Sequence, residues 1–343
     1  MFNLEAIIRP NIKELKPYSS ARGEYSGNAS IWLDANENPY ETDLNRYPDP
    51  LQSELKRVVS NSKGVPSDQI FIGNGSDEAI DLLFRAFCEP GKDKAYLFPP
   101  TYGMYEVSAQ INAIEVVKIN LTEEFELPET GAILNAVNSR GLLFVCSPNN
   151  PTGTVYPLSQ IRSLASQFSG IVVVDEAYID FAQGKSATSL LDDTPNLVVL
   201  QTLSKAYGLA GLRVGMAFAN ANIITILNSL KPPYNINTLS QQKGIEAILN
   251  QKQKDRQVAE ILSERTALAM GLKKLPIVKK VYPSEANFIL AQFENANTVY
   301  QTLRSHGVVI RNRTSQVKDA LRISIGTPEE NQTLLTILNE IAQ

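Results

Sequence analysis

Short apolar segments alternate with amphipathic ones through much of the chain. Seven apolar runs are rich in β-branched or aromatic residues and are bounded by turn residues, which is typical of strands. These runs cover residues 69–72, 94–98, 113–119, 141–146, 170–175, 196–202 and 214–219. Helical patterns lie between several of them, for example at residues 76–88 and 157–168. This alternation favours the α/β class, with a mainly parallel seven-stranded sheet between helices.

The pattern changes after residue 240. Residues 240–275 are helical and highly charged with one apolar face, so they could bridge two domains. Strand patterns at 278–293 and 320–326, with helical patterns at 298–307 and 328–342, indicate a smaller α+β domain. The irregular N-terminal segment has no core of its own, so we expect it to pack on this C-terminal domain. We therefore predict a large domain at residues 43–245 and a small domain formed by residues 1–42 and 246–343.

Composition narrows the possible partners. The chain has 32 basic and 36 acidic residues, a formal net charge of −4, so no generic attraction for nucleic acid is expected. The apolar charge-free stretch at residues 214–230 is interrupted by polar side chains and is shorter than the ~20 apolar residues of a membrane span. We expect no membrane role and a cytoplasmic location. Both cysteines, Cys88 and Cys146, have apolar neighbours and are interpreted as core residues.

A single histidine restricts the chemistry. His306 lies in a pattern typical of a surface helix end, and it alone would have to serve any Ser-His-Asp triad, Cys-His pair or histidine-rich zinc site. We therefore expect no metal site and look for chemistry elsewhere.

Four polar motifs follow predicted strands, where open parallel sheets place ligand sites. In GNGSDEAI, Ser76 is predicted to cap a helix whose free N–H groups suit an anion, although Glu78 breaks the Rossmann glycine spacing. In SPNNPTG, the amide of Asn150 would project toward the sheet edge. In VVVDEAYIDF, Asp175 ends an apolar run and requires a cation to stay ionised, and Tyr178 follows it. Each motif alone is also compatible with an ordinary turn or cap.

The fourth motif, TLSKAYGLAGLR, contains an isolated lysine. The nearest charged neighbour of Lys205 in the sequence is Arg213, eight residues away. An uncharged cavity close to another cation lowers the pKa of a lysine and makes it a nucleophilic amine. Most lysines are simply solvated, but together the four motifs supply an amine, a carboxylate, an amide, a phenol and an anion cradle. This set fits pyridoxal phosphate, which has an aldehyde, a ring nitrogen, a phenolic oxygen and a phosphate.

The ordered motifs NPTG, DEAY and SKAYGLAGLR resemble those of the fold-type-I pyridoxal-phosphate aminotransferases. LDANENP, RYPDP, GNGSDE, FPPTYGMY, SEANFIL and LRISIGT are similar to the histidinol-phosphate branch of that family. The resemblance extends from residue 17 to the C-terminal helix. It implies that Lys205 bonds to the cofactor and shuttles a proton, that Asp175 pairs with the ring nitrogen, and that Tyr178 belongs to the catalytic set.

The resemblance also implies the remaining contacts. Cofactor contacts are expected from Ser76, Asp77, Tyr102, Asn150, Tyr178, Thr202, Ser204 and Arg213, with Tyr47 reaching the phosphate of the neighbouring subunit in a homodimer. Substrate contacts are expected from Arg322, Arg311, Tyr18, Asn36 and Glu37. The motif RNRTS departs from the family pattern, which leaves the choice between Arg311 and Arg313 open.

The reaction implied by this resemblance moves an amino group from glutamate to imidazole-acetol phosphate. It yields 2-oxoglutarate and L-histidinol phosphate by ping-pong kinetics in histidine biosynthesis. Two alternatives share the fold, an aromatic-amino-acid aminotransferase and a phosphothreonine-type decarboxylase. A nucleotide-binding oxidoreductase is disfavoured by Glu78, and a Walker A loop by Ile179, which stands where a glycine is required.

Overall fold

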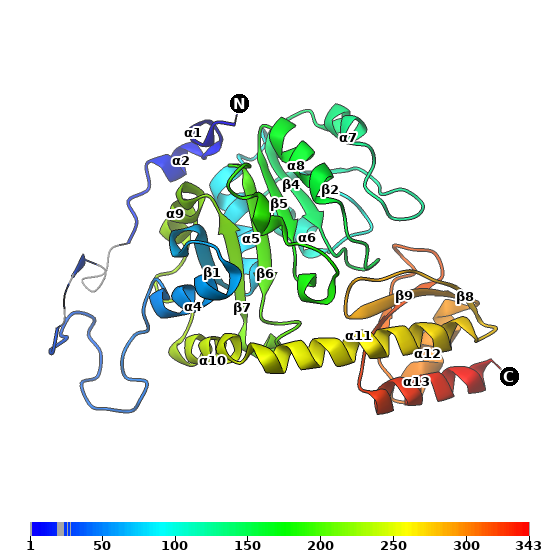
Figure 1. Ribbon diagram of the computed structural model, residues 1–343. Coiled ribbons are helices and arrows are strands. Elements are labelled where there is room, and N and C mark those ends of the chain that lie inside the picture. The colour runs from blue at the N-terminus through cyan, green and yellow to red at the C-terminus, as the bar shows by residue number, and fades with distance from the viewer. Residues whose placement is uncertain (1, 19–23, 26, 28, 343) are drawn as a thin grey trace.

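The computed structural model describes residues 2–18, 24, 25, 27 and 29–342. A seven-stranded sheet with the order β1-β7-β6-β5-β4-β2-β3 forms the centre of the larger part (Figure 1). Its strands are β1 (Ile70–Asn74), β2 (Lys94–Leu97), β3 (Glu115–Lys118), β4 (Gly141–Cys146), β5 (Ile171–Asp175), β6 (Leu197–Thr202) and β7 (Val214–Ala219). β7 runs antiparallel to the other six strands of this sheet, which share one direction. The predicted strands and the mainly parallel sheet are confirmed.

The central strands are buried on both faces, which explains their nearly continuous apolar sequences. Along β4, Leu142 and Phe144 contact one apolar layer, whereas Leu143 and Val145 contact the other. The first layer includes α5 (Ser76–Phe87), α6 (Met104–Ile111) and α9 (Ala221–Leu230). The second includes α4 (Ser53–Lys63), α7 (Thr130–Ala136), α8 (Leu158–Gln167) and α10 (Thr238–Leu249). Short 3₁₀ turns are η1 (Ser67–Gln69), η2 (Ile179–Phe181), η3 (Ala187–Leu190) and η4 (Ala210–Leu212).

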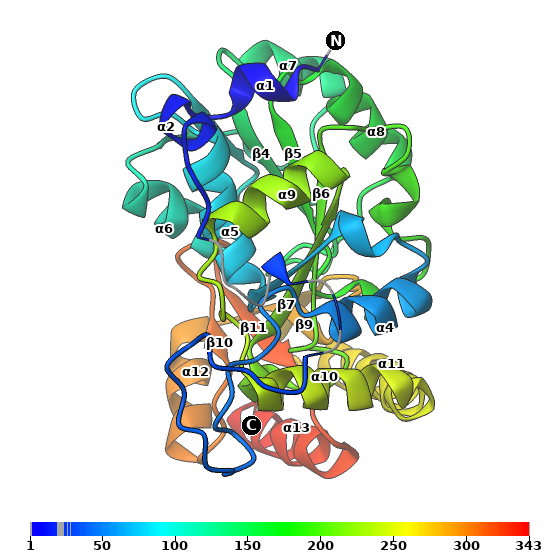
Figure 2. The same ribbon diagram turned by 90° about the vertical axis from the view of Figure 1, so that its left-hand side faces the viewer.

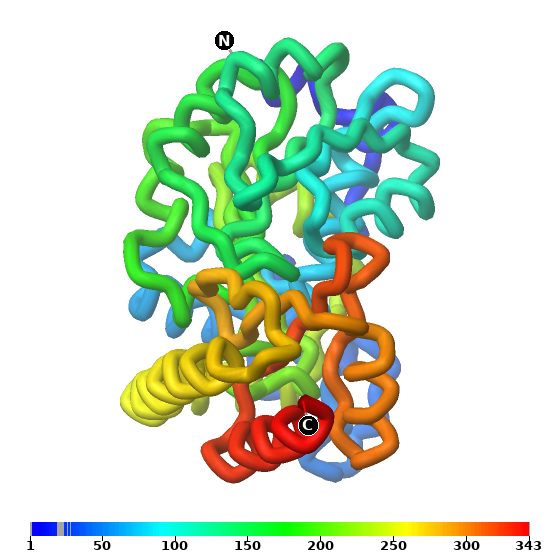
Figure 3. Tube along the Cα trace, turned by 90° about the vertical axis from the view of Figure 1, so that its right-hand side faces the viewer, coloured from blue at the N-terminus to red at the C-terminus, as the bar shows by residue number. Residues whose placement is uncertain are grey.

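The smaller part is an antiparallel sheet with helices on one face. Its order is β10-β11-β9-β8, formed by β8 (Val278–Val281), β9 (Phe288–Phe293), β10 (Arg311–Asn312) and β11 (Ala320–Ser324). Three helices lie side by side against it, α11 (Gln251–Lys273), α12 (Ala296–Ser305) and α13 (Pro328–Ile341) (Figure 3). Leu272, Phe293 and Leu303 are central in their shared core. The predicted α+β character is confirmed, and the short β10 is an addition.

The charged helical stretch after residue 240 is two helices rather than one. α10 ends at Leu249, and α11 begins at Gln251 after the irregular Asn250. The boundary expected at residue 245 falls inside α10. α11 runs from beneath the large sheet to the small one, so the predicted bridge between the two parts is present (Figure 1). No helix among the described residues is both long and apolar enough to span a membrane.

The N-terminal residues differ from the expectation that they pack on the C-terminal domain. Two short helices, α1 (Leu4–Ile7) and α2 (Pro10–Lys13), lie on the large domain instead. Ile7 and Ile8 join the apolar layer that contains α5 and α9, and the Arg9 side chain pairs with Glu89 at 3.1 Å. Residues 29–51 then run along the side of the molecule opposite the small domain (Figures 1 and 2). Burial of these isoleucines explains why the segment needs no core of its own.

Candidate active site

A cavity of about 220 Å³ opens where the parallel strands β4, β5 and β6 end. Each of these strands is followed by one of the polar motifs singled out in the sequence, and the start of α5 closes a further side. Ten of the predicted residues line this cavity: Ser76, Asp77, Tyr102, Asn150, Asp175, Tyr178, Thr202, Ser204, Lys205 and Arg213. Parallel strands therefore gather groups that lie up to 137 positions apart, as the distance from Ser76 to Arg213 in the sequence shows.

Lys205 follows β6 and reaches into the cavity. Its side chain is accessible through the opening, yet loss of hydration next to the protein lowers its pKa, and the positive charge of Arg322 lowers it further. Asp175 acts in the opposite direction and only partly offsets these effects. The ammonium nitrogen lies 5.6 Å from the centre of the Tyr178 ring. A lysine with a lowered pKa has more neutral amine at physiological pH, which is the form that attacks a carbonyl.

Asp175 ends β5 and is buried, with 3% of its surface exposed. Burial raises the pKa of the carboxyl group, and a hydrogen bond from Tyr105 is the strongest opposing effect. The Tyr105 hydroxyl donates to Oδ2 at 2.6 Å, and the Ala177 backbone N–H donates to Oδ1 at 3.0 Å. Sequence reasoning missed Tyr105, although it stands three residues after Tyr102 in the motif that was noted. No spacing rule would connect it to a strand 70 residues away.

The start of α5 forms one wall of an anion cradle. The N-cap is Gly75, with φ 74°, and Ser76 is the first helical residue, so the prediction of Ser76 as N-cap is wrong. The guanidinium of Arg213 lies against Gly75, and the positive φ of Gly75 is a backbone conformation that other residues rarely adopt, so glycine is favoured at this position. Thr202 and Ser204 place two hydroxyl groups nearby, hydrogen-bonded to each other at 2.9 Å. Helix N–H groups, hydroxyls and a guanidinium together suit a phosphate.

Arg322 connects the small domain to this cavity. It lies on β11, and its guanidinium group donates a hydrogen bond to the side-chain oxygen of Asn150. That bond leaves the Asn150 amide nitrogen to donate to another group. The guanidinium also lies over the Phe288 ring, 5.2 Å from its centre. Its buried Nε has no hydrogen-bond partner among the described residues, as expected of a group that awaits an anion.

Two further arginines approach Arg322. Arg311 is its direct partner across the antiparallel β10–β11 pair, so the two side chains emerge on one face of the sheet. Arg313 follows the end of β10 and lies close enough for the charges of Arg322 and Arg311 to act on it. Burial and the charges of Arg322 and Arg311 lower the pKa of Arg313 to about 10. Arg313 is half-buried with its Nε unpaired within the described part of the chain, whereas Arg311 is exposed.

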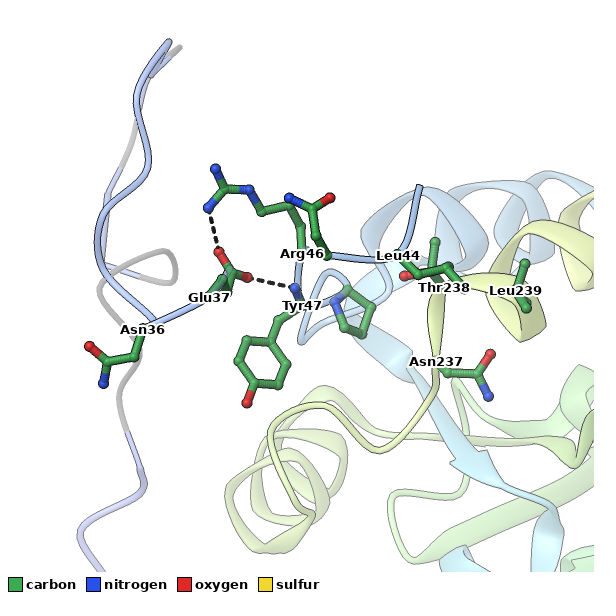
Figure 4. Close-up of a pocket in the computed structure, with 10 residues that line it drawn as sticks. Asn36, Glu37, Leu44, Arg46, Tyr47, Asn237, Thr238 and Leu239 are labelled. Atoms are coloured by element: carbon green, nitrogen blue, oxygen red, sulfur yellow. Dashed lines mark hydrogen bonds and ion pairs between the residues drawn. The ribbon is translucent and has the colours of Figure 1, made fainter. Parts of the chain in front are cut away.

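The N-terminal residues of the predicted site lie elsewhere in this single chain. Asn36, Glu37 and Tyr47 line a separate pocket of about 420 Å³, shown in Figure 4. Glu37 accepts hydrogen bonds from Arg46 at 2.8 Å and from the Tyr47 backbone at 2.6 Å. The Tyr47 ring stacks on Tyr234 with 4.4 Å between ring centres. Tyr18 is 73% exposed and does not line the cavity of Lys205 either.

The residues around Lys205 fit pyridoxal phosphate. The cradle at Gly75 has the helix start, hydroxyls and guanidinium that a phosphate needs. The same cavity is also lined by a buried carboxylate, a phenol and an accessible amine, those of Asp175, Tyr178 and Lys205. By contrast, no group of three or more potential metal-ligating side chains occurs in the described ranges. His306 is exposed at the end of α12, and both cysteines are buried and unpaired.

Comparison with known proteins gives the family. The sequence model described as "Aminotransferase class I and II" matches residues 21–338. The chain belongs to this family. A Cytophaga hutchinsonii protein named histidinol-phosphate aminotransferase is 51% identical over 344 residues, covering 98% of this chain and 99% of the relative. The expected reaction class and the dependence on pyridoxal phosphate are confirmed by this membership.

Solved structures agree on the fold. The crystal structure of the histidinol-phosphate aminotransferase from Clostridium acetobutylicum has a TM-score of 0.80 at 23% identity and covers 88% of this chain and 91% of that one. The enzyme of the same name from Sinorhizobium meliloti, solved in complex with pyridoxal-5'-phosphate, has a TM-score of 0.79 at 23% identity. It covers 88% of this chain and 83% of that one. The predicted fold-type-I architecture is confirmed.

Proposed function

We propose that this enzyme transfers an amino group from glutamate to imidazole-acetol phosphate, giving 2-oxoglutarate and L-histidinol phosphate. The observation that carries the choice of substrate is the 51% identity, over nearly the whole chain, to a protein named for that activity. The chemistry of the site supports this choice, because the charges of Arg311, Arg313 and Arg322 act on one another and Arg322 bonds to Asn150, which lines the cavity of Lys205. Both substrates are anionic, one through carboxylates and the other through a phosphate ester.

Pyridoxal phosphate, when bound, supplies an aldehyde for the amino group and a ring that withdraws electrons from the substrate carbon. Ser76, Thr202, Ser204 and Arg213 would hold its phosphate at the start of α5. Asn150 and Tyr178 would hydrogen-bond its ring oxygen, and Tyr102 would stack on its ring. The contacts of these side chains within the chain are compatible with these roles. The amide nitrogen of Asn150 is available because Arg322 occupies the amide oxygen.

Two charged side chains would handle the protons. The Lys205 amine, with its lowered pKa, would remove a proton from the substrate carbon and return one to the cofactor. The Asp175 carboxylate would keep the ring nitrogen protonated, because a buried anion stabilises an adjacent cation. Both groups line the same cavity. The burial of Asp175 would also keep competing water away from that interaction.

Arginine side chains would select the substrates. A guanidinium binds a carboxylate and a phosphate with the same two-pronged geometry, so one site could accept glutamate and the phosphate ester in turn. We assign Arg322 to this task together with Arg311 or Arg313. Besides burial, the charge of Arg311 lowers the pKa of Arg322, and the charge of Arg322 lowers the pKa of Arg313, so the three groups lie close together. The electrostatic repulsion among the three would fall when an anion enters.

We further propose a homodimer in the cytoplasm. Residues 29–51 carry several large apolar side chains with half or more of their surface exposed, among them Ile31, Leu33, Tyr40 and Tyr47. A neighbouring subunit would bury these side chains. In such a symmetric dimer, the N-terminal site residues of each subunit would reach the Lys205 cavity of the other subunit: Tyr47, Tyr18, Asn36 and Glu37. Tyr47 would then contact the phosphate of the neighbouring subunit's cofactor. A cytoplasmic location agrees with a biosynthetic reaction fed by glutamate and with two unpaired cysteines.

The decisive experiment is a substrate panel on the purified protein loaded with pyridoxal phosphate. We expect kcat/KM for histidinol phosphate to exceed that for phenylalanine and tyrosine by at least about tenfold, which corresponds to ~1.4 kcal/mol of transition-state binding. Phosphothreonine should release no carbon dioxide. Higher kcat/KM for an aromatic amino acid would indicate the aromatic aminotransferase instead, and release of carbon dioxide would indicate the decarboxylase.

A further inference from the structure

A buried tyrosine supports the carboxylate at the bottom of the cavity. Tyr105 lies on α6 and is fully buried, and its hydroxyl donates to Oδ2 of Asp175 at 2.6 Å. Loss of hydration keeps the Tyr105 hydroxyl protonated, since it raises the pKa of Tyr105 well above its ordinary value. Tyr105 does not line the cavity, and it reaches the cavity through residues that do: Asp175, by the hydrogen bond, and Tyr102, by a ring contact.

Packing fixes the direction of this hydroxyl. The Tyr105 ring stacks on Phe144 of β4, with 4.6 Å between centres and 18° between planes. Its other neighbour is Tyr102, whose ring meets it edge-on at 5.4 Å. β4 and β5 are adjacent parallel strands, so the ring is held against the strand beside the one that ends in Asp175. An aromatic ring clamped between two others has little rotational freedom, so its donor points in one direction.

Asp175 would be poorly ionised without such a donor. Desolvation is the largest effect on its pKa and raises it, and the nearby charge of Asp77 on α5 acts in the same sense. Lys205 opposes them from the loop after β6, more weakly than the Tyr105 hydrogen bond does. Three further groups face the carboxylate from the elements around it: Cys146 at the end of β4, Tyr102 before α6 and Tyr178 after β5. All three are neutral at physiological pH because their pKa values are raised.

We propose that Tyr105 is a positioning residue that holds the Asp175 carboxylate ionised and in one orientation toward the cofactor. The inference rests on the proposed cofactor role of Asp175 and adds a residue behind it. The second oxygen of Asp175 is held by the Ala177 N–H, so both ends of the carboxylate have a defined partner. Tyr105 on α6 thereby acts through Asp175 on the ring nitrogen of the cofactor. Removal of the Tyr105 hydroxyl would lower the fraction of cofactor whose ring nitrogen is protonated.

The test replaces the hydroxyl and keeps the ring. Tyr105→Phe should retain the stacking on Phe144 and fold like the parent. With pyridoxal phosphate labelled with ¹⁵N at the ring, the nitrogen resonance should move from the protonated toward the unprotonated position, because an Asp175 that lacks its donor competes better for the shared proton. The displacement should shrink as pH falls, since a lower pH favours protonation of the ring nitrogen itself. Asp175→Asn marks the unprotonated limit. kcat should fall about tenfold, the ratio typical of a lost hydrogen bond to a charged group.

Tyr96→Phe is the matched control. Tyr96 is equally buried, and its hydroxyl donates to the Ser139 carbonyl at 2.8 Å, far from Asp175 in the hydrogen-bond network. This variant should leave the ¹⁵N resonance unchanged even if it loses stability. An unchanged resonance in Tyr105→Phe, or equal displacements in the two variants, would overturn the assignment.

A second probe covers the case in which Tyr105→Phe does not fold. Fluorotyrosine introduced at position 105 keeps the hydroxyl and makes it a stronger donor. It should move the ¹⁵N resonance toward the protonated limit, and no movement or the opposite movement would contradict the proposal. These readouts use the cofactor alone, so they are independent of the identity of the substrate. Failure to bind pyridoxal phosphate at all would instead refute the proposed function.

Discussion

Arg322 of the small domain and Asn150 of the large domain are joined by a hydrogen bond across 172 positions of sequence. Asn150 lines the cavity of Lys205, and Arg322 meets it from β11. The bond uses Nη1 of Arg322 and leaves the buried Nε without a partner among the described residues. In the roles proposed above, the residue that would bind the substrate anion and the residue that would bind the cofactor oxygen therefore touch each other.

This arrangement predicts how arginine variants should behave. Arg322→Gln should raise KM for both glutamate and histidinol phosphate by tenfold or more, on the order of 1.4–3 kcal/mol, with bound cofactor retained. Arg313→Gln should raise KM more than Arg311→Gln, because Arg313 is half-buried beside Arg322 and Arg311 is exposed. Steady-state kinetics with both substrates measure this order. A larger effect of Arg311→Gln would assign the second contact to Arg311.

Loss of Lys205 should abolish turnover. Lys205→Ala removes the amine that would bond to the cofactor, so the visible absorbance of that bond should disappear and kcat should fall by several orders of magnitude. Borohydride reduction followed by peptide mapping should label residue 205 in the parent and no residue in the variant. Lys185→Ala, on an exposed loop, is the control and should retain both signals. A label elsewhere would refute the role of Lys205.

The proposed dimer can be tested by mixing two inactive proteins. Tyr47→Ala and Lys205→Ala protomers should exchange and form heterodimers in which one cavity has Lys205 from one chain and Tyr47 from the other. Random exchange should restore activity to about a quarter of the sites. No recovery after demonstrated exchange would show that Tyr47 acts within its own chain or not at all. Sedimentation of the parent should give a dimer at assay concentrations.

Two buried lysines make stability depend on pH. Lys56, 7% exposed, has its pKa lowered to about 8 by burial and by the charge of Lys231. Because the unfolded lysine titrates near 10.4, the unfolded chain binds more protons between pH 8 and 10, and the free energy of unfolding should rise across that window. Lys56→Met should be more stable at pH 7 and show a smaller rise. Urea unfolding at several pH values measures both, and an unchanged slope would contradict the burial of charge at Lys56.

The sequence was most informative where local pattern and burial coincide. β4, β5 and β6 are buried on both faces, so their apolar runs mark them, and the polar motif at or after the end of each run marks the cavity. Tyr105 was missed because its role comes from a contact across the fold and not from its neighbours in sequence. The N-cap at Gly75 was missed because the feature that favours glycine there, a positive φ, belongs to the folded backbone and leaves no mark in the neighbouring sequence. The two isoleucines of the N-terminal segment were too few to indicate which domain they cover.

The continuous helix α11 has a mechanical consequence. Its 23 residues span about 35 Å from the large sheet to the small one. A tilt of about 5° at the large-domain end would therefore carry the small sheet by roughly 3 Å, enough to make or break a hydrogen bond at Arg322. Such a tilt would change the distance between Arg322 and Lys205 without rebuilding the strands that hold Lys205.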